Sequence, residues 1–376
     1  MIYLDNAATS YPKPKNVLLS VMPSVNNYSF NSGRGGYTQS LASAEKIYSV
    51  RERVGKFFGF SPQNVVFTKN CTEALNMAIK GSVKKGEHII ISSLEHNSVA
   101  RVVNKLYLDG ICTYDIAPFS FDEDETVAAF SSLIKDNTSL IVCTHSSNVF
   151  GVSLPIRKIG ELCKNHGIRF IVDGAQGAGV ADINAKRDNI DIFCAPGHKC
   201  LYGLMGTGFM AVGDNITLDT LMEGGTGSSS SLLTQPDFLP DRFEAGTLNN
   251  TGIISVGRGI DFINSFGRDK IYSHEMSLVF ALYDMLSSLN NVILYTPRPN
   301  KNKTMPILSF NVKNVPCEKV AAVLGDNGIC VRAGLHCSPL AHKHFNTEKI
   351  GTVRVSPGAF NIKKECLTFV DVVKKL

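Results

Sequence analysis

The sequence predicts an α/β protein whose mostly parallel sheet is covered by helices, followed by a smaller α+β region. Up to about residue 200, short runs rich in Val and Ile alternate with stretches of helical periodicity, an alternation typical of parallel sheets. From about residue 223 this pattern changes. With 376 residues, the chain is also longer than one hydrophobic core usually supports, which indicates two domains or one large domain with an appendage.

Five short apolar runs are predicted to be buried strands, because they are rich in β-branched residues and lack an alternating polar face. In chain order they are NVVFT (64–68), HIIIS (88–92), LIVCT (140–144), RFIVD (169–173) and DIFCA (191–195). Between them lie stretches with helical periodicity, two of which stop at a glycine as helices commonly do. These predicted helices are TEALNMAIKG (72–81), SVARVVNKLYLDG (98–110) and PIRKIGELCKNHG (155–167).

The second region begins with a segment that lacks the hydrophobic periodicity of a helix or a strand. This segment, EGGTGSSSSLLTQPDFLPD (223–241), is rich in Gly, Ser and Pro and is predicted to be a long loop. After a helical stretch, strand-like and helix-like segments follow one another: PILSFNV (306–312), CEKVAAVLGDNG (317–328), TVRVSPG (352–358) and a final helix from Asn361. This order predicts a smaller α+β domain.

The composition is that of an ordinary globular protein, with 44% hydrophobic and 19% charged residues. The net charge of +5 is small for this length, and no Lys/Arg block is longer than a pair, so no nucleic-acid partner is expected. No apolar run is long enough to span a bilayer, and the N-terminus lacks the layout of a signal peptide. We therefore expect a cytoplasmic protein with no membrane partner.

The ten cysteines are scattered along the chain and include no C-x-x-C pair. This spacing argues against a zinc ribbon, a thioredoxin-like motif and a disulfide framework, and favours mostly buried, reduced thiols. No metal site is expected.

Three strand-to-helix junctions carry side chains suited to a ligand, which in an open α/β sheet binds where strands end. Thr72 stands at the start of a helix whose free amides attract an anion, although a plain N-cap explains it equally well. Asp173 ends the fourth predicted strand, where a carboxylate could hold a protonated ring nitrogen or cap a turn. Lys199, within CAPGHKCLYG (194–203), is either a nucleophilic amine or a solvated surface lysine.

Taken together, these side chains predict a site for pyridoxal phosphate. This cofactor needs a phosphate cradle, an acidic partner for its pyridinium nitrogen and an amine for covalent attachment. Thr72, Asp173 and Lys199 offer these three groups at strand ends that would share one crevice. His96, at another such junction, could stack on a flat ring, move a proton or be solvated.

The chain resembles, over essentially its whole length, the class V aminotransferase group of fold type I pyridoxal-phosphate enzymes, and within it the cysteine desulfurases and selenocysteine lyases. The matching stretches are IYLDNAATS (2–10), SGRGGYTQSLAS (32–43), FTKNCTEALN (67–76), LEHNS (94–98), HSSNVFG (145–151), VDGAQGAG (172–179), GHK (197–199), RFEAGTLN (242–249), VRAGLHC (331–337) and TVRVSPGAFN (352–361).

The resemblance implies an architecture as well as a cofactor. The large cofactor-binding domain is expected at residues 16–255, with a mostly parallel seven-stranded sheet flanked by helices. The smaller α+β domain is expected to combine residues 1–15 and 256–376. It would carry the loop with the catalytic cysteine and the arginine that binds the substrate carboxylate.

Matching positions also imply the residues that hold the cofactor ring. Lys199 matches the lysine that attaches the cofactor and moves protons at the substrate α-carbon. Asp173 matches the partner of the pyridinium nitrogen, and Gln176 the residue that bonds the phenolic oxygen of the ring. His96 matches the histidine that stacks on the ring and takes part in catalysis.

The phosphate ligands follow from the same comparison of motifs. Thr72 and His198 match phosphate ligands of one subunit, and Thr247 matches a ligand donated by the second subunit of a homodimer. Cys71, beside Thr72, stands where relatives usually have a small or hydroxyl residue and is assigned to the cofactor site.

On the substrate side, Asn148 and Arg354 match the groups that grip the amino-acid carboxylate, a task that suits a planar guanidinium. Asn148 is expected to contact the cofactor as well. Arg332 is assigned to substrate binding and lies close to Cys337 in sequence, and Cys337 matches the desulfurase nucleophile.

The implied reaction converts L-cysteine to L-alanine and transfers the sulfur to Cys337 as a persulfide. A selenocysteine lyase, acting on L-selenocysteine, or another β-eliminating lyase or aminotransferase of class V, remains the alternative. The short GLHCSPLAH stretch (334–342) resembles the branch of desulfurases in which a dedicated acceptor protein collects the sulfur. A homodimer is implied by the resemblance alone.

Overall fold

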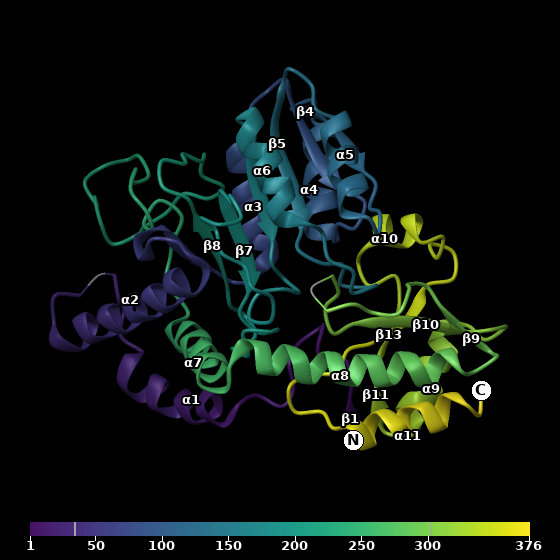
Figure 1. Cartoon of the computed structure of the whole chain (residues 1–376). Helices are drawn as coiled ribbons and strands as arrows, with labels where there is room; N and C mark the ends of the chain where they lie inside the picture. Colours follow the sequence, from purple (N-terminus) through teal and green to yellow (C-terminus); the bar gives the residue numbers. More distant parts are fainter. Residues whose placement is uncertain (34, 302) are drawn as a thin grey trace.

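Two sheets organise the chain in the computed structural model, one of seven strands and one of four, beside a two-stranded ribbon (Figure 1). The structure describes residues 1–33, 35–301 and 303–376, so that Arg34 of the matched SGRGGYTQSLAS stretch lies outside the described residues. The long helix α8 (Arg268–Ser287) runs beneath the smaller sheet.

The seven-stranded sheet has the order β2-β8-β7-β6-β5-β3-β4. All neighbours are parallel except β8, which runs antiparallel to both β2 and β7. Its strands are β2 (Val65–Thr68), β3 (Glu87–Ser92), β4 (Cys112–Ala117), β5 (Thr138–Thr144), β6 (Arg169–Asp173), β7 (Ile192–Pro196) and β8 (Gly208–Val212). The carboxyl ends of β6 and β7 therefore lie side by side at one edge.

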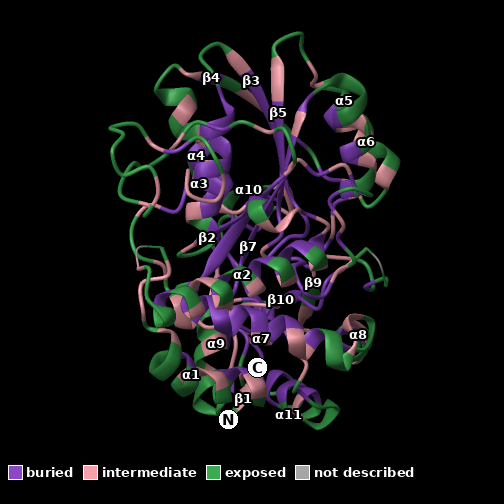
Figure 2. Ribbon diagram, turned by 90° about the vertical axis from the view of Figure 1, so that its left-hand side faces the viewer, coloured by how far each residue is buried: buried purple, intermediate pink, exposed green. Residues whose placement is uncertain are grey.

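Helices cover both faces of this sheet, because successive residues of a strand point to opposite sides. On β6, Ile171 packs with one group of helices, and Phe170 and Val172 pack with the other. The first face is covered by α3 (Cys71–Ser82) and α4 (Asn97–Leu108). The second face is covered by α2 (Thr38–Phe58), α5 (Glu123–Ser132), α6 (Ile156–His166) and α7 (Asn250–Phe266). Figure 2 shows the central strands buried, whereas the helices that cover them combine buried and exposed residues.

The smaller sheet, of order β12-β13-β10-β9, is antiparallel throughout. It packs on α8, α9 and α11 around a second core that includes Leu282 and Phe310. Its elements are β9 (Val292–Leu294), β10 (Leu308–Val312), α9 (Cys317–Asp326), β12 (Arg332–Gly334), α10 (Pro339–His344), β13 (Thr352–Val355) and α11 (Lys363–Val373).

The N-terminal segment joins the two parts of the fold. β1 (Ile2–Tyr3) pairs with β11 (Ile329–Cys330), and Asp5 forms a parallel bridge with Ser356. After it come α1 (Lys15–Tyr28), which contacts α7 and α2, and the short 3₁₀ helix η1 (Pro62–Asn64). Residues near the start of the chain therefore reach the end of β13.

The predicted fold class is confirmed: the chain is α/β, with a mostly parallel seven-stranded sheet flanked by helices and a smaller α+β part. All five predicted strands exist, and residues 213–249 contain neither helix nor strand, as the predicted loop at 223–241 requires. The boundaries at residues 15/16 and 255/256 stay a prediction. Within the described residues, no helix combines the length and apolar content needed to cross a membrane.

Candidate active site

Lys199 and Asp173 lie at the carboxyl ends of neighbouring parallel strands. Asp173 is the last residue of β6 and pairs in register with Cys194 of β7, and Lys199 follows the end of β7 by three positions. Burial lowers the pKa of the Lys199 amine, although the charge of Asp173 opposes this shift. A desolvated amine with a lowered pKa is a nucleophile at moderate pH.

Asp173 is itself buried, at 2% exposure. Burial raises the pKa of its carboxyl, opposed by the N–H of Ala175, which donates to Oδ1 over 2.9 Å, and by Lys199. The Cys71 thiol also donates to Oδ1, over 3.5 Å. Cys71 therefore lies directly beside the predicted pyridinium partner, in the first turn of α3.

His96 presents a neutral ring at the start of α4, where it is the N-cap residue. Its Nδ1 accepts a hydrogen bond from the Ser98 backbone N–H over 3.0 Å, which puts the proton of a neutral ring on Nε2. Burial lowers the pKa of His96 to about 4, and the charges of Lys199 and Arg332 add to the shift.

Thr72 is exposed in the first turn of α3, and its hydroxyl shares a 2.8 Å hydrogen bond with the Ser98 hydroxyl. The alternative prediction of Thr72 as an N-cap is wrong, because Asn70 takes that role by accepting the Glu73 N–H over 2.9 Å. Thr72 is instead one of the first-turn residues whose N–H groups lack an intrahelical partner, a position suited to an anion.

His198 directly precedes Lys199 in the chain. Among the described residues, its buried Nδ1 has no hydrogen-bond partner. Burial lowers the pKa of His198 to about 4, aided by the charges of Lys199 and Lys13. Its backbone oxygen accepts from the Lys13 amine over 2.8 Å, which ties the N-terminal segment to the Gly-His-Lys turn.

Gln176 makes a second link to that segment. Its side-chain amide is buried at 3% exposure and donates to the Ala7 backbone oxygen over 3.1 Å. Gln176 and Lys199 line the same small cavity, of about 30 Å³, together with Cys200 and Glu275.

Arg354, on β13, is 1% exposed and has its guanidinium partly engaged. Nη1 donates to the Asn148 backbone oxygen over 2.8 Å, and Nη2 forms an ion pair with Asp5. Within the described residues, the buried Nε has no partner. Burial lowers the pKa of Arg354, and Asp5 opposes that shift. The N–H of Nε is therefore a hydrogen-bond donor that no described residue uses.

Cys337 lies exposed in the turn between β12 and α10, close to a cation. Arg332 Nη2 lies 3.7 Å from the Cys337 sulfur. His336, which precedes the cysteine, is no second cation, because burial lowers the pKa of its ring to about 3. Both His336 and Cys337 have positive φ angles, 51° and 58°, a conformation costly for non-glycine residues that surrounding contacts must hold.

Two sets of contacts hold this turn. The Asn148 amide donates to the His336 backbone oxygen over 2.8 Å, and the Ser338 hydroxyl donates to Asn148 Oδ1 over 2.6 Å. The Cys337 backbone oxygen accepts from the Asn97 N–H over 2.8 Å. The thiol-bearing turn is thus fixed against the start of α4.

A cavity of about 400 Å³ connects several of the predicted residues. Thr72, His96 and Cys337 line it, with the basic side chains of Arg101 and Lys80 beside them. Thr247 is not brought to this site: it is exposed in the segment before α7, and among the described residues no hydrogen bond or ion pair links it to the others.

Sequence reasoning missed three residues of this region. Asp5 pairs with Arg354, Ser338 steadies the Cys337 turn, and Glu95 is fully buried beside His96. Burial raises the pKa of Glu95 to about 8, and its Oε1 accepts from the Thr144 N–H over 2.8 Å. Asp5 and Glu95 stand inside the matched IYLDNAATS and LEHNS stretches, which was the available signal.

Comparison with known proteins decides the family. A sequence model of the class-V aminotransferases matches residues 2–369. The chain belongs to the class-V aminotransferase family. This match confirms the resemblance to the class V aminotransferases that the sequence motifs indicated.

Three members are particularly informative. A probable cysteine desulfurase from Methanothermobacter thermautotrophicus is 33% identical over 385 aligned residues, covering 100% of this chain and 94% of the relative. The apo structure of a cysteine desulfurase from Thermococcus onnurineus NA1 has 31% identity and a TM-score of 0.90, covering 100% of this chain and 94% of that one. A cysteine desulfurase from Escherichia coli, at 23% identity, shares the fold with a TM-score of 0.87 over 99% of this chain and 94% of its own.

Proposed function

We propose that this class-V chain is a pyridoxal-phosphate-dependent cysteine desulfurase that converts L-cysteine to L-alanine and takes the sulfur onto Cys337. One observation carries the proposal: Asn148 contacts both the turn with the exposed thiol and Arg354. An enzyme that binds an amino-acid carboxylate and attacks the side-chain sulfur needs a cation and a thiol held at a fixed distance and orientation from each other. Relatives at 31% and 33% identity that are named cysteine desulfurases support the same activity.

The residues present fit pyridoxal phosphate. Lys199 would attach it, Asp173 would face its pyridinium nitrogen, Gln176 would bond its phenolic oxygen, and the neutral ring of His96 would stack on it. Support comes from the lowered pKa of the Lys199 amine and from the buried carboxyl at the end of the neighbouring strand. When bound, the cofactor supplies an electron sink for charge that develops at the substrate α-carbon.

For the phosphate, we assign Thr72 and His198 of the same chain, and we assign Cys71 to the ring side of the cofactor site, where its thiol contacts Asp173. The first turn of α3 offers free backbone N–H groups, and the Thr72 hydroxyl stands exposed there. Burying His198 Nδ1 without a partner costs free energy, and a bound anion or its hydration shell would satisfy it. Thr247 is assigned to the phosphate bound by a second copy of the chain.

Arg354 binds the substrate carboxylate through the unpartnered Nε edge of its fork. A planar guanidinium engages a carboxylate through two parallel hydrogen bonds, here from Nε and from the second N–H of Nη2, whose first N–H is paired with Asp5. Asn148 orients Arg354 through its backbone oxygen. Arg332, whose Nη2 lies 3.7 Å from the Cys337 sulfur, would attract an incoming anionic substrate.

Lys199 and Cys337 divide the chemistry between them. Lys199 accepts the proton from the substrate α-carbon. The Cys337 thiolate then attacks the substrate sulfur, so that an S–S bond forms and the C–S bond breaks. The electron pair left on the β-carbon takes up a proton, Lys199 returns a proton to the α-carbon, and the products are alanine and a persulfide on Cys337.

The working assembly proposed here is a homodimer. Its support is an apolar face on α1, where Leu18, Leu19, Met22 and Val25 are 44% to 65% exposed. Such a contiguous patch usually marks an interface. The assignment of Thr247 to the second copy's phosphate requires the same arrangement.

We further propose a separate acceptor protein for the persulfide and a cytoplasmic location. The Cys337 turn is short and fixed by hydrogen bonds on both sides, so the acceptor thiol has to approach the enzyme rather than the reverse. All ten cysteines are free, which suits a reducing compartment.

The test is product analysis with purified, cofactor-loaded protein. Given L-cysteine and a reductant, it should release alanine and sulfide in equal amounts. The ratio of kcat/KM for L-selenocysteine to kcat/KM for L-cysteine distinguishes this activity from that of a selenocysteine lyase. Formation of pyruvate and ammonia instead of alanine would identify a β-eliminating lyase. Transfer of the amino group to a keto acid would identify an aminotransferase, and either result would refute the proposal.

A further inference from the structure

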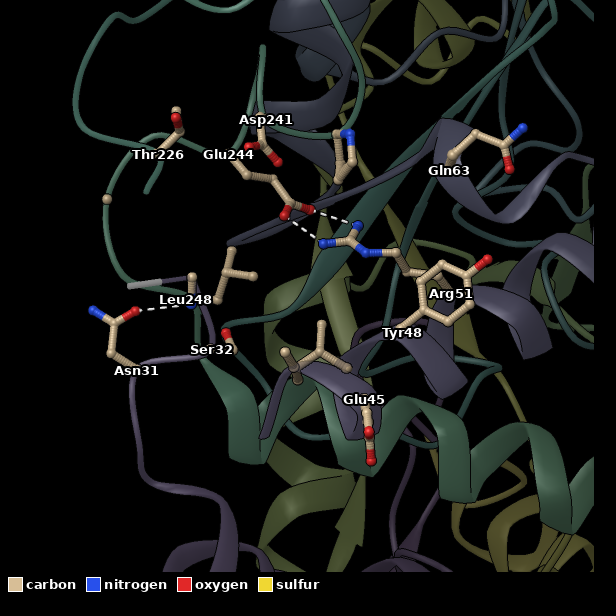
Figure 3. A pocket seen from close by; sticks show the side chains of 15 residues that line it. Asn31, Ser32, Glu45, Tyr48, Arg51, Gln63, Thr226, Asp241, Glu244 and Leu248 are labelled. Carbon is tan, nitrogen blue, oxygen red and sulfur yellow. Dashed lines mark hydrogen bonds and ion pairs between the residues drawn. The ribbon is translucent and has the colours of Figure 1, made fainter. Parts of the chain in front are cut away.

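A third cavity, of about 410 Å³, lies between α2 and the segment 226–248 (Figure 3). Its wall contains an ion pair between Arg51 of α2 and Glu244, with side chains only 7% and 6% exposed. Figure 3 shows the two groups meeting side by side, each terminal nitrogen of the guanidinium facing one carboxylate oxygen. Glu244 stands three positions before Thr247, in the matched RFEAGTLN stretch.

Arg51 and Glu244 form hydrogen bonds with the backbone as well as with each other. Arg51 Nη1 donates to Glu244 Oε1 over 2.8 Å, while Nη2 donates to Oε2. Arg51 also donates to the Val65 backbone oxygen, and the Phe67 N–H donates to Glu244 Oε1 over 2.6 Å. The guanidinium lies over the Phe67 ring, 4.7 Å from its centroid.

These backbone contacts fall on the open edge of the large sheet. Among the described residues, β2 is the outermost strand and pairs only with β8. Val65 and Phe67 therefore present a carbonyl and an N–H that no described strand takes. Arg51 and Glu244 satisfy both groups. The pair thereby fastens the 241–248 segment to the edge of a rigid sheet.

Stability alone gives little reason to keep two charges here. Removing two charges from water is costly, and apolar side chains of similar volume often stabilise a buried site as well or better. An apolar pair could not fix the orientation of the side chain at position 244, whereas a bidentate ion pair holds Glu244 in one orientation. Beyond it, Gly246 and Thr247 are exposed, and Gly246 has a φ of 96°.

We propose that the Arg51–Glu244 pair positions Thr247 for the cofactor phosphate bound by a second copy of the chain. This inference rests on the proposed function, and in particular on the homodimer and on Thr247 as a phosphate ligand. Arg51 and Glu244 act through Thr247 and touch neither cofactor nor substrate. The pair would therefore influence cofactor affinity only while Thr247 is present.

A double-mutant cycle tests this dependence. The variants are Thr247→Ala, the pair replacement Arg51→Met with Glu244→Met, and all three changes together. Each is titrated with pyridoxal phosphate, and the dissociation constant is read from the absorbance of the bound cofactor. Loss of one hydrogen bond to the phosphate should weaken binding about tenfold in Thr247→Ala and in the pair replacement. The triple variant should be no weaker than Thr247→Ala.

The inference would be overturned if the fold-changes in dissociation constant of Thr247→Ala and of the pair replacement multiply in the triple variant. An unchanged dissociation constant in the pair replacement would also overturn it. A pair replacement that is monomeric by size-exclusion chromatography would also overturn it, because the pair would then act on assembly. An unchanged constant in Thr247→Ala would refute the Thr247 assignment and with it this inference. Alanine formation from cysteine would in that case still stand as the test of the enzyme reaction.

Two further variants keep the experiment decisive. Val320→Ala, in the core of the smaller part, lowers stability without touching the cavity and should leave the dissociation constant unchanged. Glu244→Gln retains an oxygen acceptor for the Phe67 N–H but removes the charge. If the pair replacement does not fold, Glu244→Gln with and without Thr247→Ala completes the same cycle.

Discussion

The side-chain amide of Asn148 donates a hydrogen bond to the backbone oxygen of His336 over 2.8 Å, across 188 positions of the sequence. The same side chain accepts from Ser338, and the Asn148 backbone oxygen accepts from Arg354. Cys337 therefore sits between two residues held by one asparagine, which also contacts the predicted carboxylate-binding arginine. Substrate binding and sulfur uptake depend on one set of contacts.

Removing one of these contacts should loosen the thiol-bearing turn. Ser338→Ala deletes the donor to Asn148 Oδ1, worth about 1 kcal/mol, so we expect kcat for alanine formation to fall about fivefold. Amide hydrogen exchange of residues 335–338 should become faster, while cofactor affinity stays the same. Unchanged exchange together with unchanged kcat would show that Asn148 does not steady the turn.

Arg354 should be sensitive even to a conservative change. Arg354→Lys keeps the charge but cannot form two parallel hydrogen bonds with a carboxylate, and we expect kcat/KM for L-cysteine to fall roughly 10- to 100-fold. Steady-state kinetics check this, with cofactor absorbance as the control for an intact site. A lysine variant with the kinetics of the parent protein would remove Arg354 from substrate binding.

Cys337 should be the thiol that reacts first in the native protein. Of the ten cysteines, all within the described residues, it alone is exposed; Cys200 and Cys330 are intermediate and the others are buried. Brief treatment with iodoacetamide followed by peptide mass spectrometry should find the label on Cys337, and none at that site in Cys337→Ser. Faster labelling of Cys200 or Cys330 would contradict the accessibility described above.

Glu95 should make stability depend on pH. Its pKa is raised from 4.5 to about 8 in the folded chain, so between these values unfolding releases a proton, and raising the pH favours the unfolded state. Glu95→Gln removes this contribution, up to about 1.4 kcal/mol per pH unit. Urea unfolding across this range should show stability falling less steeply with pH in the variant. Identical slopes would mean that Glu95 is ionised in the folded protein.

Five strands of the large sheet could be predicted because each is a short, mostly buried apolar run. β4 (Cys112–Ala117), at the end of the sheet, was missed because its middle residues are partly or fully exposed and include polar side chains. β8 (Gly208–Val212) escaped prediction, since its antiparallel place between β2 and β7 depends on pairing with distant segments. α1 was also missed: Pro23 stands inside the helix, where proline normally interrupts helical structure, and its Leu19 and Met22 are exposed.

For the site, the motifs indicated the residue types but not their contacts. Lys199 and Asp173 could be placed together because both follow strands of one parallel sheet. The pairing of Arg354 with Asp5 joins residues 349 positions apart, and no periodicity encodes such a contact. The N-cap at Asn70 rather than Thr72 likewise depends on local backbone geometry, since Asn70 has the extended conformation that capping requires.

The most direct measurement of the central claim is peptide mass spectrometry of the cofactor-loaded protein after a single turnover with L-cysteine and no reductant. The account predicts one added sulfur atom on Cys337 and one equivalent of alanine. In Cys337→Ala, which should still bind the cofactor, neither should form. Sulfur added at another cysteine, or alanine formed by Cys337→Ala at the parent rate, would contradict Cys337 as the acceptor.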